Sequence, residues 1–410
     1  MSVTYSIPGA ILTEREHSVP LDHARPDGQK ITVFTREIAD PDGRDKPYLI
    51  FFQGGPGMEG TRPTTPPGGW VRRALKDFRV LMLDQRGTGR STPVGKDLPG
   101  DTAEAQAEYL THFRADSIVR DAELIRQELG VDRWSTLGQS FGGFCTMTYL
   151  SMAPHGLRES FITGGLAAIG RPVDEIYSTT YRLTADKNAA YFARYPGDQA
   201  RAKEIFHRLD TEDVRLRSGD RLTSRRLRQM GNDLGFSDTW EAIHHLLELP
   251  FGSNGFLIDA ESITPGFERN PIYATIHEAC YADGGATRWS ASRLYPRHFE
   301  ELGYFTAEHI FPWMFEDYGW LRGHAAAAEI LANHEWPRLY DPDVLAHNEV
   351  PVAAAIYFND LYVPSQFSIE TAAAIRGLKP WITNEYEHNG LRADSDRVLG
   401  RLIDLARGRA

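Results

Sequence analysis

The sequence has little cysteine, no long apolar run and no excess of positive charge, and each shortage excludes a class of protein. Only Cys145 and Cys280 are cysteines among 410 residues, so we expect no disulfide framework and a reducing compartment. No stretch approaches the roughly 20 apolar residues of a membrane span. Residues 1–12 lack the basic and apolar segments of a signal peptide. The sequence therefore predicts a soluble, cytoplasmic protein without a membrane partner.

Positive charge is also short: 45 Lys and Arg face 56 Asp and Glu, giving a net charge of −11. Nucleic-acid binding needs a basic face, so it is not expected. The one arginine-rich run, 215–228, has no aromatic residue for base stacking and predicts a solvated helical face. No metal-binding spacing of Cys and His is present, so we predict no metal and no cofactor.

Apolar runs and helical patterns alternate along the first part of the chain. Residues 48–52 and 79–83 are continuous apolar runs, typical of strands buried in a parallel sheet. A helix is predicted over 116–129, capped by Asp116 and ended by Gly130. Further strands (134–137, 160–164) and a helix (141–153) continue the alternation. The order predicts an α/β fold with a mostly parallel sheet and helices on both faces.

The pattern changes near residue 170. From there to about residue 336 the sequence is helical, aromatic and charged, without a strand rhythm. Two strands (352–358, 381–386) and an amphipathic helix (391–406) follow. We therefore predict an α/β core in two parts, 1–169 and 337–410, with a helical cap over 170–336 inserted before the last strands.

A GxSxG sequence, residues 138–142, stands between a predicted strand and a predicted helix. In that position it indicates a nucleophile elbow, a sharp turn that presents Ser140 at the amino end of the helix. The glycines let the strand and the helix approach closely. The alternative is an ordinary glycine-rich turn.

A serine nucleophile needs a base, and the base needs an orienting acid. In this fold the chain order is serine, acid, histidine. Asp360 follows the strand over 352–358, and His388 follows the last strand. Both are therefore at carboxyl ends of strands, where open α/β sheets place their sites. An ordinary surface histidine is the alternative for His388.

The oxyanion of an acyl-transfer intermediate needs preset backbone N–H donors. Phe141, directly after the serine, supplies one. Gly55 supplies the other, because the loop 53–57 (QGGPG) directly follows a buried strand and its glycines allow close approach.

Three blocks give the chain a resemblance to the prolyl aminopeptidase (proline iminopeptidase) family of the α/β-hydrolase superfamily. They are GGPG at 54–57, DQRGTGRS at 84–91 and GQSFGG at 138–143. We read the second block as mainly structural. Many members have His where this chain has Gln53, and a longer subgroup is similar in having Gln there. The resemblance implies an α/β-hydrolase fold with a helical cap over the site.

In that family the cap binds the free amino terminus with carboxylates and encloses the proline ring among apolar side chains. The resemblance assigns this role to segments 276–281 and 311–317. The first offers Glu278 and Tyr281, and the second offers Glu316 or Asp317. Trp313, Phe315, Phe141 and Phe144 are candidates for the proline pocket. The alternative is that these are surface acids beside core aromatic residues.

The sequence thus predicts a serine peptidase that removes N-terminal proline from peptides through an acyl-enzyme. One alternative is another hydrolase on the same scaffold, an esterase or a broader aminopeptidase, since a fold does not set its substrate. The other is a non-catalytic binding protein with a hydrolase fold.

Overall fold

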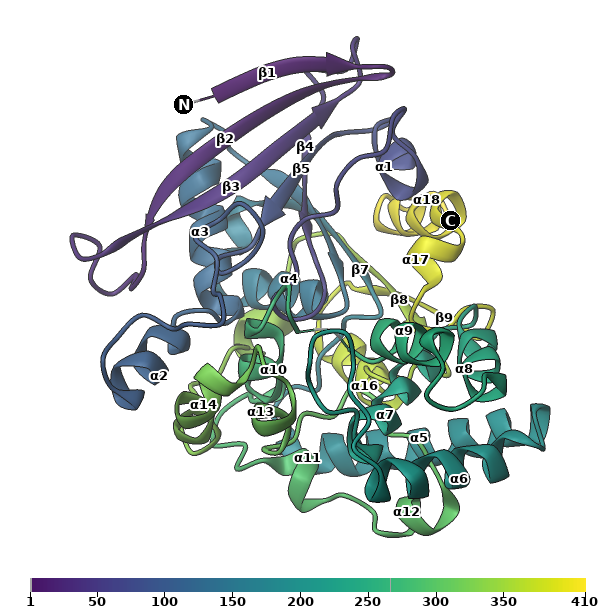
Figure 1. Ribbon diagram of the computed structural model, residues 1–410. Coiled ribbons are helices and arrows are strands. Elements are labelled where there is room, and N and C mark those ends of the chain that lie inside the picture. Colours follow the sequence, from purple (N-terminus) through teal and green to yellow (C-terminus); the bar gives the residue numbers. More distant parts are fainter. Residues whose placement is uncertain (1, 266) are drawn as a thin grey trace.

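A nine-stranded sheet forms the centre of the computed structural model, which describes residues 2–265 and 267–410 (Figure 1). The strand order is β1-β2-β3-β5-β4-β6-β7-β8-β9. Neighbours from β1 to β5 in this order pair antiparallel, and the pairs from β5 to β9 are parallel. The strands are β1 (Ser2–Ile7), β2 (Ala10–Pro20), β3 (Lys30–Ala39), β4 (Tyr48–Phe52), β5 (Arg79–Asp84), β6 (Trp134–Gln139), β7 (Leu157–Thr163), β8 (Val352–Tyr357) and β9 (Lys379–Thr383).

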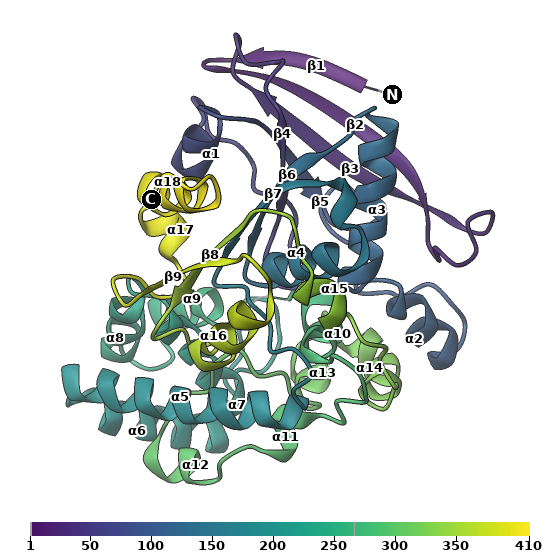
Figure 2. The ribbon, with the colours of Figure 1, turned by 180° about the vertical axis from the view of Figure 1, so that it is seen from behind.

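Helices cover both faces of this sheet, which is why strands such as β4 and β8 are apolar along their whole length. Leu49 and Phe51 of β4 pack with α1 (Gly69–Ala74) and α18 (Ser395–Ala406). Ile50 and Phe52 point to the opposite face, toward α3 (Ala115–Glu128) and α4 (Phe141–Met152) (Figure 2). Successive side chains of a strand point to opposite faces, so one apolar run serves two cores. The predicted mostly parallel α/β sheet is confirmed.

The boundaries of α3 correct one detail of the prediction. The helix begins at Ala115 with Arg114 at the N-cap position, and Asp116 lies in the first turn rather than at the cap. Its negative carboxylate is stabilised there by the positive end of the helix dipole. It also forms an ion pair with Arg120, with Oδ2 and Nη1 2.7 Å apart. The predicted end is confirmed: Gly130 has φ 67° and donates its N–H to Gln127 O at 3.0 Å.

The chain between β7 and β8 is helical within its described residues and contributes no strand to the central sheet. Figure 1 shows these helices gathered at one end of the sheet. No helix of the described chain is both long and apolar enough to cross a membrane. The division into 1–169, 170–336 and 337–410 stays a prediction. The helices of this segment are α5 (Val173–Arg194), α6 (Asp198–Thr211), α7 (Ser224–Leu227), η2 (Arg228–Gly235), α8 (Trp240–Glu248), α9 (Asn254–Ile263), α10 (Ile272–Tyr281), α11 (Ser290–Arg293), α12 (His298–Leu302), α13 (Met314–Asp317), η3 (Arg322–His324), α14 (Ala325–Ala332) and α15 (Pro342–Ala346).

The other helices join the strands of the core. They are α2 (Ala103–Thr111), η1 (Pro154–Gly156), α16 (Ser365–Ala374) and α17 (Gly390–Ala393).

The end of the chain differs from the prediction in two details. The last strand, β9, is shorter than predicted and starts earlier, at Lys379. The predicted closing helix is divided into α17 and α18.

The arginine-rich run over 215–228 is not the solvated helical face that the sequence predicted. Arg226 is 1% exposed and its guanidinium lies 3.4 Å from Asp220. Arg228 is also buried and donates to the carbonyl oxygens of Phe299 and Tyr304. These two arginines tie the loops of the cap together, and only the earlier arginines of the run and Arg225 reach the surface.

The DQRGTGRS block is structural, as predicted. The Arg86 guanidinium is fully buried and pairs with Asp121 of α3 at 2.6 Å. It also donates to the carbonyl oxygens of Pro20, Leu21 and His112. A buried cation needs such partners, and here they join the end of β2 to the helix layer.

Candidate active site

Ser140 occupies a strained turn between β6 and α4. Its backbone has φ 54° and ψ −126°, a conformation that residues other than glycine rarely adopt. The turn can be tight because residues 138, 142 and 143 are glycines. A Cβ at Gly142 would lie 1.9 Å from Phe52 O, and one at Gly143 would lie 2.4 Å from Gly165 O. The hydroxyl therefore stands at the amino end of α4, as a nucleophile elbow requires.

Asp360 and His388 are in direct contact. His388 Nδ1 lies 2.7 Å from Asp360 Oδ2, and both residues are buried. The other carboxylate oxygen accepts the backbone N–H groups of Tyr362 and Val363, each at 2.9 Å. With Nδ1 engaged by the carboxylate, Nε2 is the ring nitrogen left to take a proton.

The three predicted catalytic residues surround one glycine turn after β7. A Cβ at Gly164 would lie 3.1 Å from His388 Nδ1 and 3.2 Å from Asp360 Oδ2. A Cβ at the next residue, Gly165, would lie 2.5 Å from Ser140 O. The side chain of Gln139 also donates to His388 O at 3.2 Å. The structure thus brings the serine, acid and histidine loops together.

Burial lowers the pKa of His388, but the charge and hydrogen bond of Asp360 raise it, with a smaller contribution from Glu308. The net effect is a pKa above the usual 6.5. This environment favours an imidazolium, the form that a general base reaches after accepting a proton.

The loop predicted to bind the oxyanion lies against the serine. A Cβ at Gly54 would be 3.0 Å from Ser140 Cβ. Gly55 has φ 124°, which favours glycine, and the Gln85 side chain donates to Gln53 O at 3.0 Å. Phe141 is the first residue of α4, so its N–H has no acceptor within the helix. Both predicted donors are therefore at the elbow.

Glu278 is buried, but its carboxylate has structural partners. It accepts the backbone N–H groups of Ser290 at 3.2 Å and Ala291 at 2.9 Å, at the start of α11. Burial raises the pKa of Glu278 and these N–H bonds partly offset the rise. The carboxylate therefore caps the N-terminus of α11 within the helical cap.

Glu316, Trp313 and Phe315 lie in a different part of the cap. The Glu316 side chain is 76% exposed, 3.6 Å from Arg225. The Trp313 ring stacks on the Phe311 ring, with centroids 5.5 Å apart, and Phe315 packs against Trp289. Among the described residues, these side chains contact neither the triad nor the elbow, and their role in substrate binding stays a prediction.

The acid that faces the triad is Glu308, which the sequence reasoning missed. Its carboxylate accepts the Tyr273 hydroxyl and lies 3.5 Å from the Tyr281 hydroxyl. His277 Nε2 is 3.9 Å away. The Glu308 charge makes a small contribution to the raised pKa of His388. The only local signal was an acid in an otherwise apolar and aromatic stretch.

Aromatic rings link this carboxylate to the elbow and to the histidine. Tyr281 contacts Phe144 of α4, with ring centroids 5.9 Å apart, and Tyr177 of α5 at 5.6 Å. The Tyr281 hydroxyl also donates to Tyr362 O, and the Tyr362 ring lies 4.7 Å from His388. Of the predicted cap residues, Tyr281 is thus the one that the structure brings beside the triad.

A group suited to a metal ion within the described chain lies elsewhere, on α8. It comprises His244, His245 and Glu248, whose ligand atoms all fall within 4.8 Å of one another. Two of the three are exposed, and His244 is held by Asp198 at 2.9 Å. Around Ser140 the structure gathers the residue types predicted for a nucleophile, a base and an acid, the set used to transfer an acyl group from a carbonyl to water.

Known proteins share both the sequence and the fold. A family model for the alpha/beta hydrolase fold matches residues 47–255. A proline iminopeptidase of Aeromonas sobria is 49% identical over 95% of each chain. The proline iminopeptidase aneH of Aspergillus aculeatus is 34% identical over 98% of this chain and 95% of its own. A solved proline iminopeptidase of Mycobacterium smegmatis aligns with 16% identity and a TM-score of 0.49, covering 96% of this chain and 99% of that one.

Proposed function

The chain belongs to the proline iminopeptidase family, and from this premise we propose that it is a serine aminopeptidase that releases proline from the amino terminus of peptides. The observation that carries the proposal is the Asp360–His388 contact beside the strained Ser140. Two free, buried cysteines support a reducing compartment, in keeping with the predicted cytoplasmic location.

The proposed reaction has two steps. Ser140 Oγ attacks the carbonyl carbon of the first residue while His388 Nε2 takes the hydroxyl proton. The N–H groups of Gly55 and Phe141 stabilise the oxyanion, and His388 returns the proton to the leaving amine as the C–N bond breaks. Water then attacks the acyl-enzyme with His388 again as base, which frees proline and the serine.

We assign recognition of the substrate ammonium to Glu308 rather than to Glu316. An exopeptidase must favour an unblocked amine, and a partly buried carboxylate near the nucleophile does so through a charge-assisted hydrogen bond. Glu308 meets this requirement because Tyr273 and Tyr281 hold it and its charge reaches His388. Glu278 then has a structural role in the cap, because it accepts hydrogen bonds from backbone N–H groups at the start of α11.

Four substrates test the proposal: proline β-naphthylamide, its N-acetyl derivative, p-nitrophenyl acetate and alanine β-naphthylamide. We expect efficient turnover of proline β-naphthylamide only, and none by Ser140→Ala. Equal cleavage of the blocked and free amides would exclude an aminopeptidase. Cleavage of the ester alone would favour an esterase, and alanine β-naphthylamide cleaved as fast as the proline substrate would favour a broader aminopeptidase.

Two isosteric variants separate the assignments within the cap. Glu308→Gln should lower kcat/KM for the proline substrate by about tenfold to a hundredfold, because it loses a charged hydrogen bond. Glu316→Gln, the surface control, should leave kcat/KM unchanged.

A fluorophosphonate probe tests the remaining alternative. If the probe fails to label Ser140, the result would favour a non-catalytic binding protein.

A further inference from the structure

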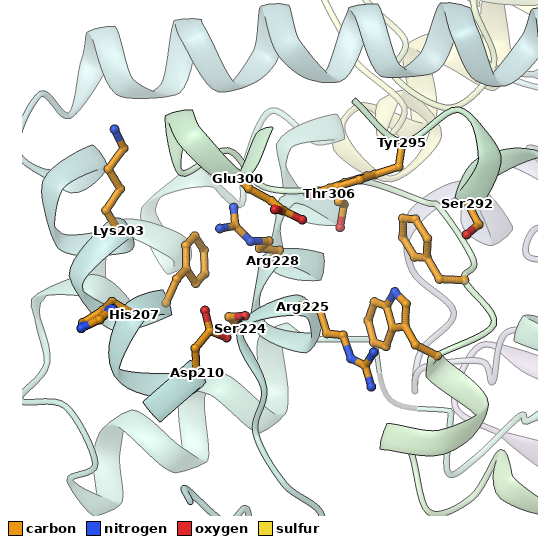
Figure 3. A pocket seen from close by; sticks show the side chains of 13 residues that line it. Lys203, His207, Asp210, Ser224, Arg225, Arg228, Ser292, Tyr295, Glu300 and Thr306 are labelled. Carbon is orange, nitrogen blue, oxygen red and sulfur yellow. Dashed lines mark hydrogen bonds between the residues drawn. The ribbon is translucent and has the colours of Figure 1, made fainter. Parts of the chain in front are cut away.

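A hollow of about 730 Å³ lies in the cap (Figure 3). Its lining contains none of the three proposed triad residues. It lies between α6, α7, the loop around Tyr295 and the segment before α13. Its volume is in the range of sites that hold small organic ligands. The side chains that line it are both aromatic and charged, and none belongs to the proposed catalytic machinery.

Arg228 is the buried cation of this hollow. The residue is 8% exposed, and no carboxylate of the described chain lies within 4.0 Å of its guanidinium nitrogens. Nη1 donates to the carbonyl oxygens of Phe299 at 3.2 Å and Tyr304 at 2.7 Å, while Nε and Nη2 have no recorded acceptor in the described structure. Burial lowers the pKa of Arg228. The Glu300 and Asp210 carboxylates act on its charge from farther away, and an incoming anion would add the direct ion pair that the guanidinium lacks.

A second buried donor lines the same hollow without a partner. Thr306 is 3% exposed, and within the described chain its hydroxyl makes no hydrogen bond. Figure 3 shows Thr306 near Arg228. Buried polar groups are normally satisfied, so a free hydroxyl beside a free guanidinium edge indicates a place for an acceptor.

Aromatic rings provide the apolar walls. Phe206 lies under the Arg228 guanidinium, 4.0 Å from the ring centroid, and Phe311 stacks on Trp313 at 5.5 Å. The lining acids Asp210 and Glu300 are exposed, and Asp210 accepts the Ser224 hydroxyl. The negative groups therefore stand toward solvent, while the cation is inside.

An aromatic layer separates this hollow from the triad. Tyr295 of the lining contacts Tyr181, which stacks on the buried His309 with centroids 4.0 Å apart. His309 in turn contacts Tyr177, the neighbour of Tyr281. A ligand in the hollow would thus lie on the far side of this layer from Glu308.

We propose that this hollow is a second binding site, which takes an organic carboxylate with an apolar body of side-chain size. The carboxylate accepts hydrogen bonds from Arg228 and Thr306, and the apolar body packs between Phe206 and Trp313. A free small acid and the C-terminal residue of a peptide share this chemistry.

Calorimetric titration of the full chain tests the site. The probes are 3-phenylpropionate for a small acid, N-acetyl-glycyl-phenylalanine for a peptide terminus, and the C-terminal amide of that peptide. We expect saturable 1:1 binding of at least one acid, and binding of the amide weaker by roughly tenfold or more, because the charged acceptor is lost. Equal binding of the peptide acid and its amide, or no binding of either acid, overturns the proposal.

Variants locate the bound acid. Arg228→Gln should weaken binding about tenfold to a hundredfold and Thr306→Val a few-fold. The control Arg208→Gln removes the same charge from α6 outside the hollow and should change nothing. Glu308→Gln should also leave binding unchanged. If Glu308→Gln alters the affinity and Arg228→Gln does not, the acid binds near the triad and the proposal is wrong.

Thr306→Val keeps the test decisive if Arg228→Gln does not fold. Valine has the shape of threonine, and the hydroxyl it removes has no partner in the described chain, so the fold should be unaffected. Unchanged affinity in this variant would then overturn the proposal by itself. All these readouts are heats of binding, so they do not depend on the proposed peptidase activity.

Discussion

Two carboxylates at different distances control the charge of His388. Asp360 is in contact with the ring at 2.7 Å, and Glu308 acts on it through space from the cap. The first fixes the ring orientation and the tautomer. The second couples the protonation of the base to the site that we propose for the substrate amine. Each carboxylate therefore has its own signature in the pH dependence.

The pH profile of kcat/KM should fall on the acid side with a pKa above 6.5, because the base acts only as neutral imidazole and its pKa is raised. Asp360→Asn should lower kcat by roughly 10⁴-fold and move this limb to lower pH, because the acid that stabilises the imidazolium is gone. Initial rates from pH 5 to 9 measure both effects. A limb that stays in place would contradict the role of Asp360.

Glu308→Gln should move the same limb to lower pH by a smaller amount, because one negative charge near His388 is removed. A purely structural role for Glu308 would change stability without moving the limb. The comparison uses the same substrate, and Glu316→Gln serves as the control with an unchanged limb. The two readouts, the limb and kcat/KM, separate the electrostatic effect from lost binding of the amine.

Among the secondary-structure elements, the elbow between β6 and α4 has the tightest packing around the site. Gly142→Ala should prevent folding or cost several kcal/mol, since its Cβ would lie 1.9 Å from the Phe52 carbonyl oxygen. Gly95→Ala is the matched control, because a Cβ there meets nothing within 4 Å and the backbone has no positive φ. Thermal melting of both variants measures the difference. Equal melting temperatures would show that the elbow tolerates a side chain.

The segment η2 connects the cap to the histidine loop. His388 N–H donates to Gly235 O at 3.3 Å, and the Tyr362 hydroxyl donates to Asn232 O. Burial raises the pKa of Asp233, between these contacts, from 3.8 to about 6. The folded protein therefore favours the protonated acid, and ionisation destabilises the fold as the pH rises through about 6.

Asp233→Asn should consequently stabilise the protein by about 1–2 kcal/mol at pH 8 and by nothing at pH 3.5. Urea unfolding at the two pH values measures this. The gain should grow between pH 4 and pH 6.5, the interval between the unfolded and the folded pKa. A pH-independent difference would contradict the assignment of this titration to Asp233.

At the scale of the whole molecule, the cap and the core meet in an ion pair next to His388, the proposed catalytic base. Lys187 of α5 pairs with Glu387, and their side chains are 12% and 18% exposed. Burial raises the pKa of Glu387, and the lysine offsets part of that rise. The pair holds α5 against the loop that positions His388.

Lys187→Met should therefore destabilise the protein by about 1–3 kcal/mol, because Glu387 is left partly buried without its partner. It should also lower kcat/KM, since the histidine loop loses its contact with α5. Arg194→Met is the control on the same helix: its partner Glu241 is exposed, and such pairs contribute little. Similar losses in the two variants would show that the Lys187 pair is an ordinary surface contact.

The residues that the sequence could predict are those tied to strand ends. Ser140, Asp360 and His388 follow β6, β8 and β9, and the parallel order brings the carboxyl ends of these strands to one edge. Glu308 has no such marker, because its place depends on how the cap folds back over the elbow. Glu316 shares its acidic, aromatic surroundings in sequence, yet the fold turns it to solvent.

The N-terminal hairpin shows the same limit in the sheet. β1 is almost wholly exposed and β2 mixes apolar with charged residues, so neither has the continuous apolar run that marked β4, β5 and β8. β1 is placed by its pairing with β2, and β2 by its pairing with β3, rather than by an apolar pattern of their own. The arginine-rich run was misread for a related reason: Arg226 donates to Asp317 O and Arg228 to Phe299 O, both far away in the sequence.

The insertion of the cap between β7 and β8 has a consequence for synthesis on the ribosome. About 190 residues separate these neighbouring strands, which takes roughly 10–40 s to translate at about 5–20 residues per second. Throughout that interval the β7 edge has no partner, and an open edge invites pairing with other chains. We expect nascent chains halted before Val352 to sediment as aggregates and those released after residue 410 to stay in the supernatant. The last seventh of the chain, from Val352 on, thus completes the proposed triad and covers the open edge of β7.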